Sequence, residues 1–181
     1  MKGIVFTEFL EMVEQRFGFE TADRIVSESE LPSGGVYTAV GTYDHQEMVR
    51  LVGSLSARSG ISVADLLKLY GEYLFGRFTV AYSRFFEPAA DAFSFLARIE
   101  DYIHVEVKKL YPDAELPTFR VARPAPEVLE LVYHSGRGLA DFAEGLLKGC
   151  MQHFGEQIHL HREQIRDDNT IVKFTLTRAR A

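Results

Sequence analysis

Three polar side chains late in the chain alternate along the sequence and could together bind an anion. They are Tyr133, Ser135 and Arg137, spaced two residues apart. In an extended segment alternate residues point the same way, so two hydroxyl groups and one guanidinium group would converge on one spot. The planar guanidinium matches a carboxylate, and hydroxyl groups can donate hydrogen bonds beside it. The pattern therefore predicts a site for a carboxylate-bearing ligand; the alternative is a strand end with polar surface residues.

One histidine, His104, could supply an imidazole to a ligand. A helix with an apolar stripe is predicted along residues 91–111, and His104 falls at the margin of the stripe, beside Phe93 and Tyr111. This position suits a histidine that faces a pocket, and it also suits a half-buried histidine without a ligand. The position alone leaves both interpretations open. The stripe consists of Leu96, Ile99, Ile103, Val107 and Leu110.

The composition of the 181-residue chain restricts the classes of function. Its 14 phenylalanines and 8 tyrosines are enough to line a large core or to enclose a flat apolar ligand. The net charge of -6 argues against a broad nucleic-acid-binding surface, and the single cysteine, Cys150, excludes disulfides and thiolate-rich metal sites. The apolar runs fall short of the ~18–20 residues that a membrane span needs, and the N-terminus lacks the apolar core of a signal peptide. We therefore expect a cytoplasmic protein that does not insert into membranes.

The elements that must position these residues are expected to be helices first and strands later. Asp44 with Glu47, and Ser62 with Asp65, have the spacing of helix N-caps. Hydrophobic periodicity predicts helices over residues 4–17, after Thr21, over 44–60, from 62 onward, over 91–111 and over 139–154. Alternating patterns predict strands over residues 118–123, 128–134, 157–161 and 171–177, with turns at 124–126 and 167–169. This order favours an α+β fold.

The histidine, the carboxylate clamp and the aromatic content together fit a flat apolar ligand that carries a metal and two carboxylates, which is haem. The chain resembles the haem nitric oxide/oxygen-binding (H-NOX) family, the gas-sensing domain also found in soluble guanylate cyclases. The resemblance covers essentially the whole chain, and its motifs occur in the family's order and spacing. The matching segments are MKGI at residues 1–4, IHVEV at 103–107, LP at 116–117, Y-x-S-x-R at 133–137 and EGLLKG at 144–149.

The resemblance implies a fold and a role for each site residue. The fold would be a helical lobe over about residues 1–61, and a larger lobe over about 62–181 with helices and a four-stranded antiparallel sheet. Haem b would lie between the lobes, with His104 as the proximal ligand of its iron. Tyr133, Ser135 and Arg137 would bind the propionates, and Pro117 would press the porphyrin out of plane. Val5, Phe78, Phe119 and Leu146 match positions that contact the haem.

The resemblance also bears on which gas is bound. Oxygen-binding members of the family carry a distal tyrosine and an asparagine, where this chain has Phe142 and Leu74. Bound O₂ needs a distal hydrogen-bond donor much more than NO does. The apolar pair therefore predicts a nitric oxide sensor that excludes O₂, with CO as a further candidate ligand. The open alternative is that Tyr43, Tyr70 or Tyr73 brings a hydroxyl group into the pocket.

The expected mechanism follows the family. NO would bind the open face of ferrous haem and weaken the iron–His104 bond, the haem would relax from the distortion around Pro117, and the two lobes would shift. Moving a population from 1:99 to 99:1 requires about 5.5 kcal/mol. Because the sequence ends soon after the last strand, we expect no attached output domain. The expected partner is a separate histidine kinase or a cyclic-di-GMP-metabolising protein.

Other functions remain as alternatives. A haem peroxidase or an NO-consuming haem protein needs distal acid–base groups, which Phe142 and Leu74 do not supply, so we expect no enzyme. A haem-free sensory domain could bind an apolar acid with the same clamp, but it would leave His104 without a role.

A zinc site at His159 and His161 is less expected than a solvated strand face. Glu72, Glu100 and Glu106 show no paired-carboxylate pattern, and Cys150 is expected in the core.

Overall fold

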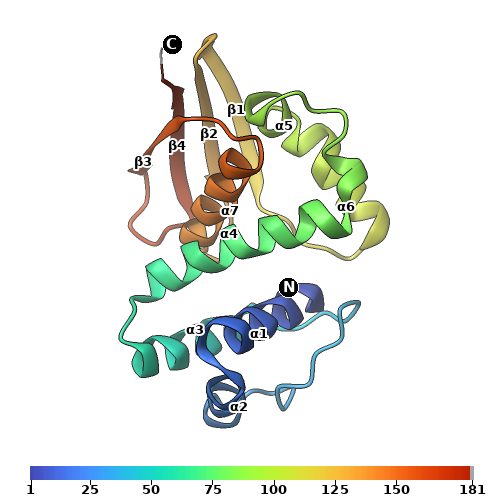
Figure 1. Cartoon of the computed structure of the whole chain (residues 1–181), viewed down its shortest axis with the longest axis vertical. Coiled ribbons are helices and arrows are strands. Elements are labelled where there is room, and N and C mark those ends of the chain that lie inside the picture. Colours follow the sequence, from blue (N-terminus) through green and yellow to red (C-terminus); the bar gives the residue numbers. More distant parts are fainter. Residues whose placement is uncertain (180–181) are drawn as a thin grey trace.

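The computed structural model describes residues 1–179, and its helices come first and its strands follow (Figure 1). The α-helices are α1 (Gly3–Phe17), α2 (Phe19–Glu28), α3 (His45–Ser59), α4 (Val63–Ala81), α5 (Ala92–Leu96), α6 (His104–Leu110) and α7 (Ala140–His153). The strands are β1 (Thr118–Ala125), β2 (Val128–His134), β3 (Ile158–Gln164) and β4 (Ile171–Arg178). A 3-10 turn, η1 (Ser83–Phe85), and a π-helical turn, η2 (Ile99–Ile103), lie between them. Within the described residues, no helix is long and apolar enough to cross a membrane.

Side-chain caps fix where α3 and α4 begin, as the sequence predicts. The carboxylate of Asp44 accepts a hydrogen bond from the backbone N–H of Gln46, and the Ser62 hydroxyl oxygen accepts one from Asp65. Each cap satisfies a backbone donor that the first helical turn leaves without a partner. The predicted contribution of Glu47 to the first cap is wrong. Its carboxylate instead accepts a hydrogen bond of 2.8 Å from the Tyr37 hydroxyl.

Helix α4 lies between two hydrophobic cores. On one side the buried faces of α1, α2 and α3 pack against Leu66, Tyr70 and Leu74 of α4. On the other side Phe75 of α4 belongs to the core between the sheet and helices α5 and α7. Figure 1 shows the same arrangement, with α1–α3 at one end of the molecule and the sheet at the other. The division into lobes near residue 61 stays a prediction, because α4 contributes to both cores.

The sheet has the order β1-β2-β4-β3 and all its pairs are antiparallel. Alternate residues of the two central strands are buried, as the sequence patterns predict. They are Leu129, Leu131 and Tyr133 in β2, and Val172, Phe174 and Leu176 in β4. Three predicted boundaries are wrong. Strand β3 continues to Gln164 rather than ending at His161. Strand β1 continues to Ala125 through a register shift, so the turn falls at residues 126–127, and α2 begins at Phe19 rather than after Thr21.

The continuous helix predicted over residues 91–111 is also wrong. A capping box of Asp91 and Ser94 starts α5, which ends at Leu96, and the chain then enters the π-helical turn η2 before α6. A π-helical turn inserts one extra residue per turn and changes which side chains share a face. Here Ile99, Ile103 and His104 all reach the wall of one cavity. Tertiary packing has overridden the regular period that the sequence pattern suggests.

Helices α4 and α7 approach each other closely along a line of glycines. A Cβ atom on Gly145 of α7 would lie 2.1 Å from the carbonyl oxygen of Lys68 in α4. A Cβ atom on Gly71 of α4 would lie 2.4 Å from the carbonyl oxygen of Phe142 in α7. Only glycine fits at such backbone separations. Gly145 and Gly71 therefore set the distance between the two helices.

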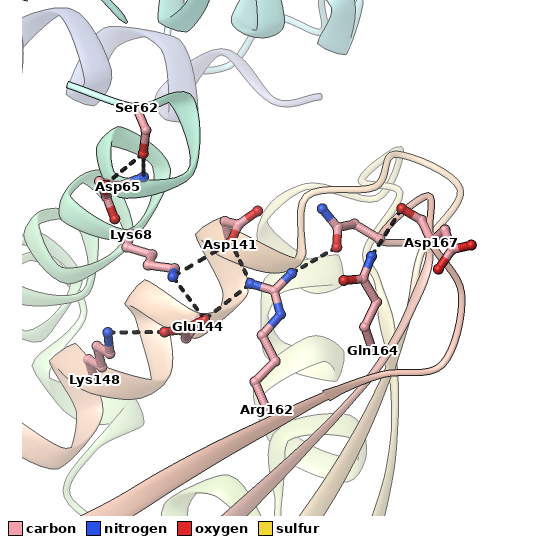
Figure 2. Close-up of polar contacts among 10 residues, drawn as sticks. Ser62, Asp65, Lys68, Asp141, Glu144, Lys148, Arg162, Gln164 and Asp167 are labelled. Carbon is pink, nitrogen blue, oxygen red and sulfur yellow. Dashed lines mark hydrogen bonds and ion pairs between the residues drawn. The ribbon is translucent and has the colours of Figure 1, made fainter. Parts of the chain in front are cut away.

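Charged side chains continue this contact toward β3 (Figure 2). The Glu144 carboxylate lies 3.4 Å from Lys68 Nζ of α4, 3.2 Å from Arg162 Nη1 of β3 and 3.0 Å from Lys148 Nζ of its own helix. Arg162 also contacts Asp141. Both acidic residues are buried, with exposed fractions of 6% for Glu144 and 8% for Asp141. We call the glycines Gly71 and Gly145, together with Lys68, Asp141, Glu144, Lys148 and Arg162, the α4–α7 seam.

Candidate functional site

A cavity of about 280 Å³ takes its walls from both hydrophobic cores. Residues from α1, α4, η2, α6, β1, β2 and α7 contribute to these walls. Every site residue predicted from the sequence lines this one cavity. These residues are Val5, Leu74, Phe78, His104, Pro117, Phe119, Tyr133, Ser135, Arg137, Phe142 and Leu146.

Aromatic residues that the sequence analysis did not single out form much of the apolar wall. The rings of Phe86 and Phe95 stack with centroids 4.9 Å apart, and Phe75 packs edge-on against Phe86 at 5.4 Å. The positions of these rings depend on how α4, η1 and α5 pack against one another, and no short sequence motif predicts this packing. Such a wall is preformed and suits a rigid apolar ligand.

His104 is the first residue of α6 and follows directly on the π-helical turn. Its Nδ1 atom lies 3.1 Å from Oε1 of Glu100, one turn earlier, and its side chain is 14% exposed. Burial lowers the pKa of the His104 imidazole below its usual value, although the charge of Glu100 acts in the opposite direction. A neutral imidazole that donates from Nδ1 leaves the lone pair of Nε2 available to a metal. Glu100 shows no paired-carboxylate pattern in the sequence, but its spacing of four residues from His104 is a signal that predicts contact between the two side chains on a helix.

The three residues of the predicted carboxylate clamp line one cavity, but the backbone path that brings them there differs from the one expected. Strand β2 ends at His134, so the segment is not extended as far as Arg137. Ser135 and Arg137 lie in a turn in which the backbone N–H of Arg137 donates to the Ser135 hydroxyl oxygen at 3.3 Å. Ser135 and Arg137 nevertheless line the same cavity as Tyr133. Burial raises the pKa of the Tyr133 hydroxyl group, which therefore keeps its proton and can donate.

The guanidinium of Arg137 already holds a carboxylate at the edge of the cavity. Its Nη2 atom lies 2.8 Å from Oε2 of Glu115, and its Nη1 atom donates to the backbone carbonyl of Glu115 at 2.9 Å. The Glu115 side chain is 85% exposed, so this ion pair is weakly held. A carboxylate of a bound ligand has the same chemistry as the Glu115 side chain and can take its place. The donor set of imidazole, apolar walls and cationic clamp therefore fits an iron porphyrin with two propionates.

The predicted distal residues present no polar atom to the cavity. Leu74 is buried, and the ring of Phe142 stacks on Tyr70 with centroids 5.2 Å apart. The three tyrosines left open by the sequence, Tyr43, Tyr70 and Tyr73, are absent from the described cavity wall. The Tyr70 hydroxyl donates to the backbone carbonyl of Val5.

Two other tyrosines, Tyr82 and Tyr111, do line the cavity. Their hydroxyl oxygens lie 3.2 Å apart, so one hydroxyl donates to the other. Burial raises the pKa of Tyr82 to about 12, and the contact with Tyr111 adds to this effect. Tyr82 therefore stays protonated at neutral pH.

The remaining candidate groups lie elsewhere. His159 and His161 are exposed on β3, and no group of three metal-ligating side chains is found among residues 1–179. The ring of His153 packs on Phe86 with centroids 5.3 Å apart. Cys150 is fully buried in the core, as predicted, and burial raises the pKa of its thiol.

Comparisons with known proteins identify the family of the chain. A family model described as Haem-NO-binding matches residues 2–162. The structure of an Fe(II) unliganded H-NOX protein from K. algicida is 43% identical, with a TM-score of 0.95, and the match covers 100% of this chain and 98% of that one. An IWP-051-bound H-NOX from Shewanella woodyi in the Fe(II)CO state is 43% identical, with a TM-score of 0.85 and coverages of 99% and 95%.

A third structure, of an H-NOX protein from S. oneidensis in the Fe(II)NO state, is 26% identical, with a TM-score of 0.92 and coverages of 99% and 100%. No curated protein matches the chain. The predicted α+β fold with a four-stranded antiparallel sheet is confirmed by these likenesses. The chain belongs to the haem-NO-binding (H-NOX) family of haem-binding gas-sensor domains.

Proposed function

We propose that this protein is a haem-based nitric oxide sensor of the cytoplasm, with haem b in the cavity and His104 as the iron ligand. When bound, the ferrous iron of the haem supplies the site that takes up the gas. The observation that carries the proposal is that His104 lines the same apolar cavity as the clamp residue Arg137. Its neutral imidazole is oriented by Glu100, as a metal ligand requires.

The other cavity residues would hold and shape the cofactor. Arg137 would exchange the exposed Glu115 carboxylate for a propionate, and Tyr133 and Ser135 would donate hydrogen bonds beside it. Pro117, directly before β1, is rigid and would press on the porphyrin. Four further apolar side chains would pack against the ring, namely Val5, Phe78, Phe119 and Leu146.

The preference for NO over O₂ would come from Leu74 and Phe142, which cannot donate a hydrogen bond to a bound gas. A Phe142→Tyr variant supplies a donor, and Phe142→Leu is the matched control. We expect Phe142→Tyr to show a shifted absorption spectrum that is stable in air, and the wild type and Phe142→Leu to show none. An air-stable shift in the wild type would mean that another donor, such as Tyr82 or Tyr111, reaches the gas.

The signal would leave through the residues that hold the cofactor. His104 would hold the iron and Pro117 would contact the porphyrin, so both residues would respond to a change at the haem when NO binds. The helical lobe over about residues 1–61 would then move relative to the rest of the chain. A separate histidine kinase or cyclic-di-GMP-metabolising protein would respond to this movement. CO is a second gas that the same apolar site would accept.

The ligand assignment is tested by His104→Gly, with His159→Gly on the exposed face of β3 as the control. Each protein is purified, reduced with dithionite without air, and its absorption spectrum recorded before and after NO. We expect His104→Gly to lose the ferrous spectrum of the wild type, and added imidazole to restore it. An unchanged spectrum and NO response in His104→Gly would show that His104 is not the ligand. A wild-type protein that takes up no haem would favour a haem-free domain that binds an apolar acid.

A further inference from the structure

One carboxylate oxygen joins the predicted iron ligand to the sheet. Oε1 of Glu100 lies 3.1 Å from Nδ1 of His104, and it accepts a hydrogen bond of 2.6 Å from the backbone N–H of Phe119. Glu100 is in the π-helical turn η2, and Phe119 is the second residue of β1. The same oxygen therefore faces polar groups at both ends of the segment that separates His104 from β1.

The contact with Phe119 follows from the place of β1 in the sheet. Strand β1 is an edge strand, so it has a neighbour, β2, on one side only. Backbone N–H groups that point away from β2 have no partner within the sheet. Glu100 satisfies one of these groups. Because Phe119 lies two residues after Pro117, the contact also fixes the start of the strand that follows this proline.

The contact with His104 decides which nitrogen of the ring is free. A carboxylate that accepts from Nδ1–H holds the imidazole in the tautomer whose Nε2 carries the lone pair. Hydrogen bonding to a negative acceptor also makes the imidazole a stronger electron donor to a metal. Among the hydrogen bonds and ion pairs of residues 1–179, Glu100 is the one side-chain partner of the His104 ring.

We propose that Glu100 is a positioning residue that sets the orientation and donor strength of His104 and ties it to the strand after Pro117. The proposal rests on the proposed function, because it requires His104 to bind the haem iron. Through Glu100, a change at His104 reaches β1 directly, without passing through the aromatic core.

A nearby glutamate provides a matched control. Glu106 lies two residues after His104 and forms an ion pair with the exposed Lys109, and within residues 1–179 it forms no hydrogen bond or ion pair with His104 or β1. Removal of Glu106 changes the charge of the same segment by the same amount as removal of Glu100. An effect that arises only from the loss of a negative charge would therefore appear in both variants. An effect that depends on the contacts of Glu100 with His104 and Phe119 would appear only in the Glu100 variants.

The test compares Glu100→Ala, Glu100→Gln and Glu106→Ala with the wild type, all as ferrous haem proteins. The first readout is the iron–histidine stretching frequency in the resonance Raman spectrum. We expect Glu100→Ala to lower this frequency, Glu100→Gln to fall between it and the wild type because its amide oxygen still accepts, and Glu106→Ala to match the wild type. We also expect haem transfer to an excess of a haem-scavenging apoprotein to be about 10–100-fold faster in Glu100→Ala.

The second readout is hydrogen exchange of the Phe119 backbone amide, which we expect to be faster in Glu100→Ala and unchanged in Glu106→Ala. A wild-type stretching frequency in a folded, haem-loaded Glu100→Ala protein would overturn the role of Glu100 and leave the proposed function intact. Should Glu100→Ala fail to fold, an unchanged frequency in Glu100→Gln overturns the proposal. A wild-type protein without haem would overturn the proposed function, and the role of Glu100 with it.

Discussion

The α4–α7 seam and the segment that carries His104 are built in opposite ways. The seam joins two long helices through glycines at backbone contact and through buried carboxylates that each have more than one cationic partner. Residues 97–117, which we call the proximal segment, contain only short helical elements, the five-residue π-helical turn η2 and the seven-residue helix α6, and they contain no buried charged residue. Short elements without a network of buried charges and close backbone contacts open at lower free-energy cost. The comparison indicates that the seam is a fixed frame and the proximal segment the part able to move.

This difference suits a sensor that must respond at one residue without unfolding. A displacement of His104 would disrupt few packing contacts of η2 and α6. The seam at the same time keeps α7, with Phe142 and Leu146 on the cavity wall, fixed against α4 and β3. Substitutions in the two regions should therefore have very different effects on stability.

The largest loss of stability is expected from Arg162→Ala. This change removes one of the two cations that Asp141 and Glu144 share, the other being Lys68, and leaves two buried carboxylates with fewer partners. Breaking a buried charge cluster in this way costs about 3–5 kcal/mol, against about 0–1 kcal/mol for Lys148→Ala, whose side chain is 36% exposed. Urea denaturation of both variants measures the difference. Equal losses in the two would mean that the seam is not a fixed frame.

A somewhat smaller loss is expected from Gly145→Ala, because the new methyl group would meet the Lys68 carbonyl oxygen. Overpacking of this kind costs about 1–3 kcal/mol, since the two helices must separate. Gly76→Ala in α4 is the matched control, because no atom lies within 4 Å of its added Cβ. There alanine should stabilise the helix by about 0.5–1 kcal/mol. Thermal unfolding should move in opposite directions for the two variants.

Acid should weaken the seam through Glu144. Burial acts to raise the pKa of this carboxyl group, but hydrogen bonds and charges from Lys148, Lys68 and Arg162 outweigh it, and the net pKa lies below the usual value of 4.5. A carboxyl group with a lowered folded-state pKa contributes stability above its unfolded pKa and loses it as the pH falls through the folded one. The free energy of unfolding should therefore drop below about pH 4.5, and less steeply in Glu144→Gln. An identical pH dependence in both proteins would contradict this role of Glu144.

The smallest effect is expected where the proximal segment contacts the residues just before α1 and α3. Asp113 accepts hydrogen bonds from Lys2 Nζ at 3.0 Å and from the Thr42 hydroxyl at 2.6 Å, in an exposed position. Exposed ion pairs contribute about 0–1 kcal/mol, so Asp113→Asn should change the free energy of unfolding by less than about 1 kcal/mol. Its ion pair should also matter less at high salt. A loss as large as that of Arg162→Ala would mean that the proximal segment is anchored as firmly as the seam.

The sequence predicted features that depend on neighbouring residues, and it failed where distant elements decide. The Asp44 and Ser62 caps and the alternating strands β2 and β4 are local, and they were predicted correctly. The break in residues 91–111 was missed, because a π-helical turn has no hydrophobic period of its own and depends on packing against the cavity.

At the candidate site the residue types were easier to predict than their geometry. Tyr133, Ser135 and Arg137 do line one cavity, although a turn rather than an extended strand carries Arg137 there. Glu100 shows no paired-carboxylate pattern in the sequence, and its contact with the backbone of Phe119 joins residues 19 positions apart, which no local pattern predicts. Only the folded chain shows that one oxygen serves both.

Hydrogen exchange of the ferrous haem protein, measured without air before and after NO, tests the contrast between the two regions most directly. We expect NO to increase exchange over residues 97–117 and at the start of β1, and to leave α7 and β3 unchanged. Exchange that increases across the α4–α7 seam while the proximal segment stays protected would contradict the central claim, as would a protein that shows no change with NO.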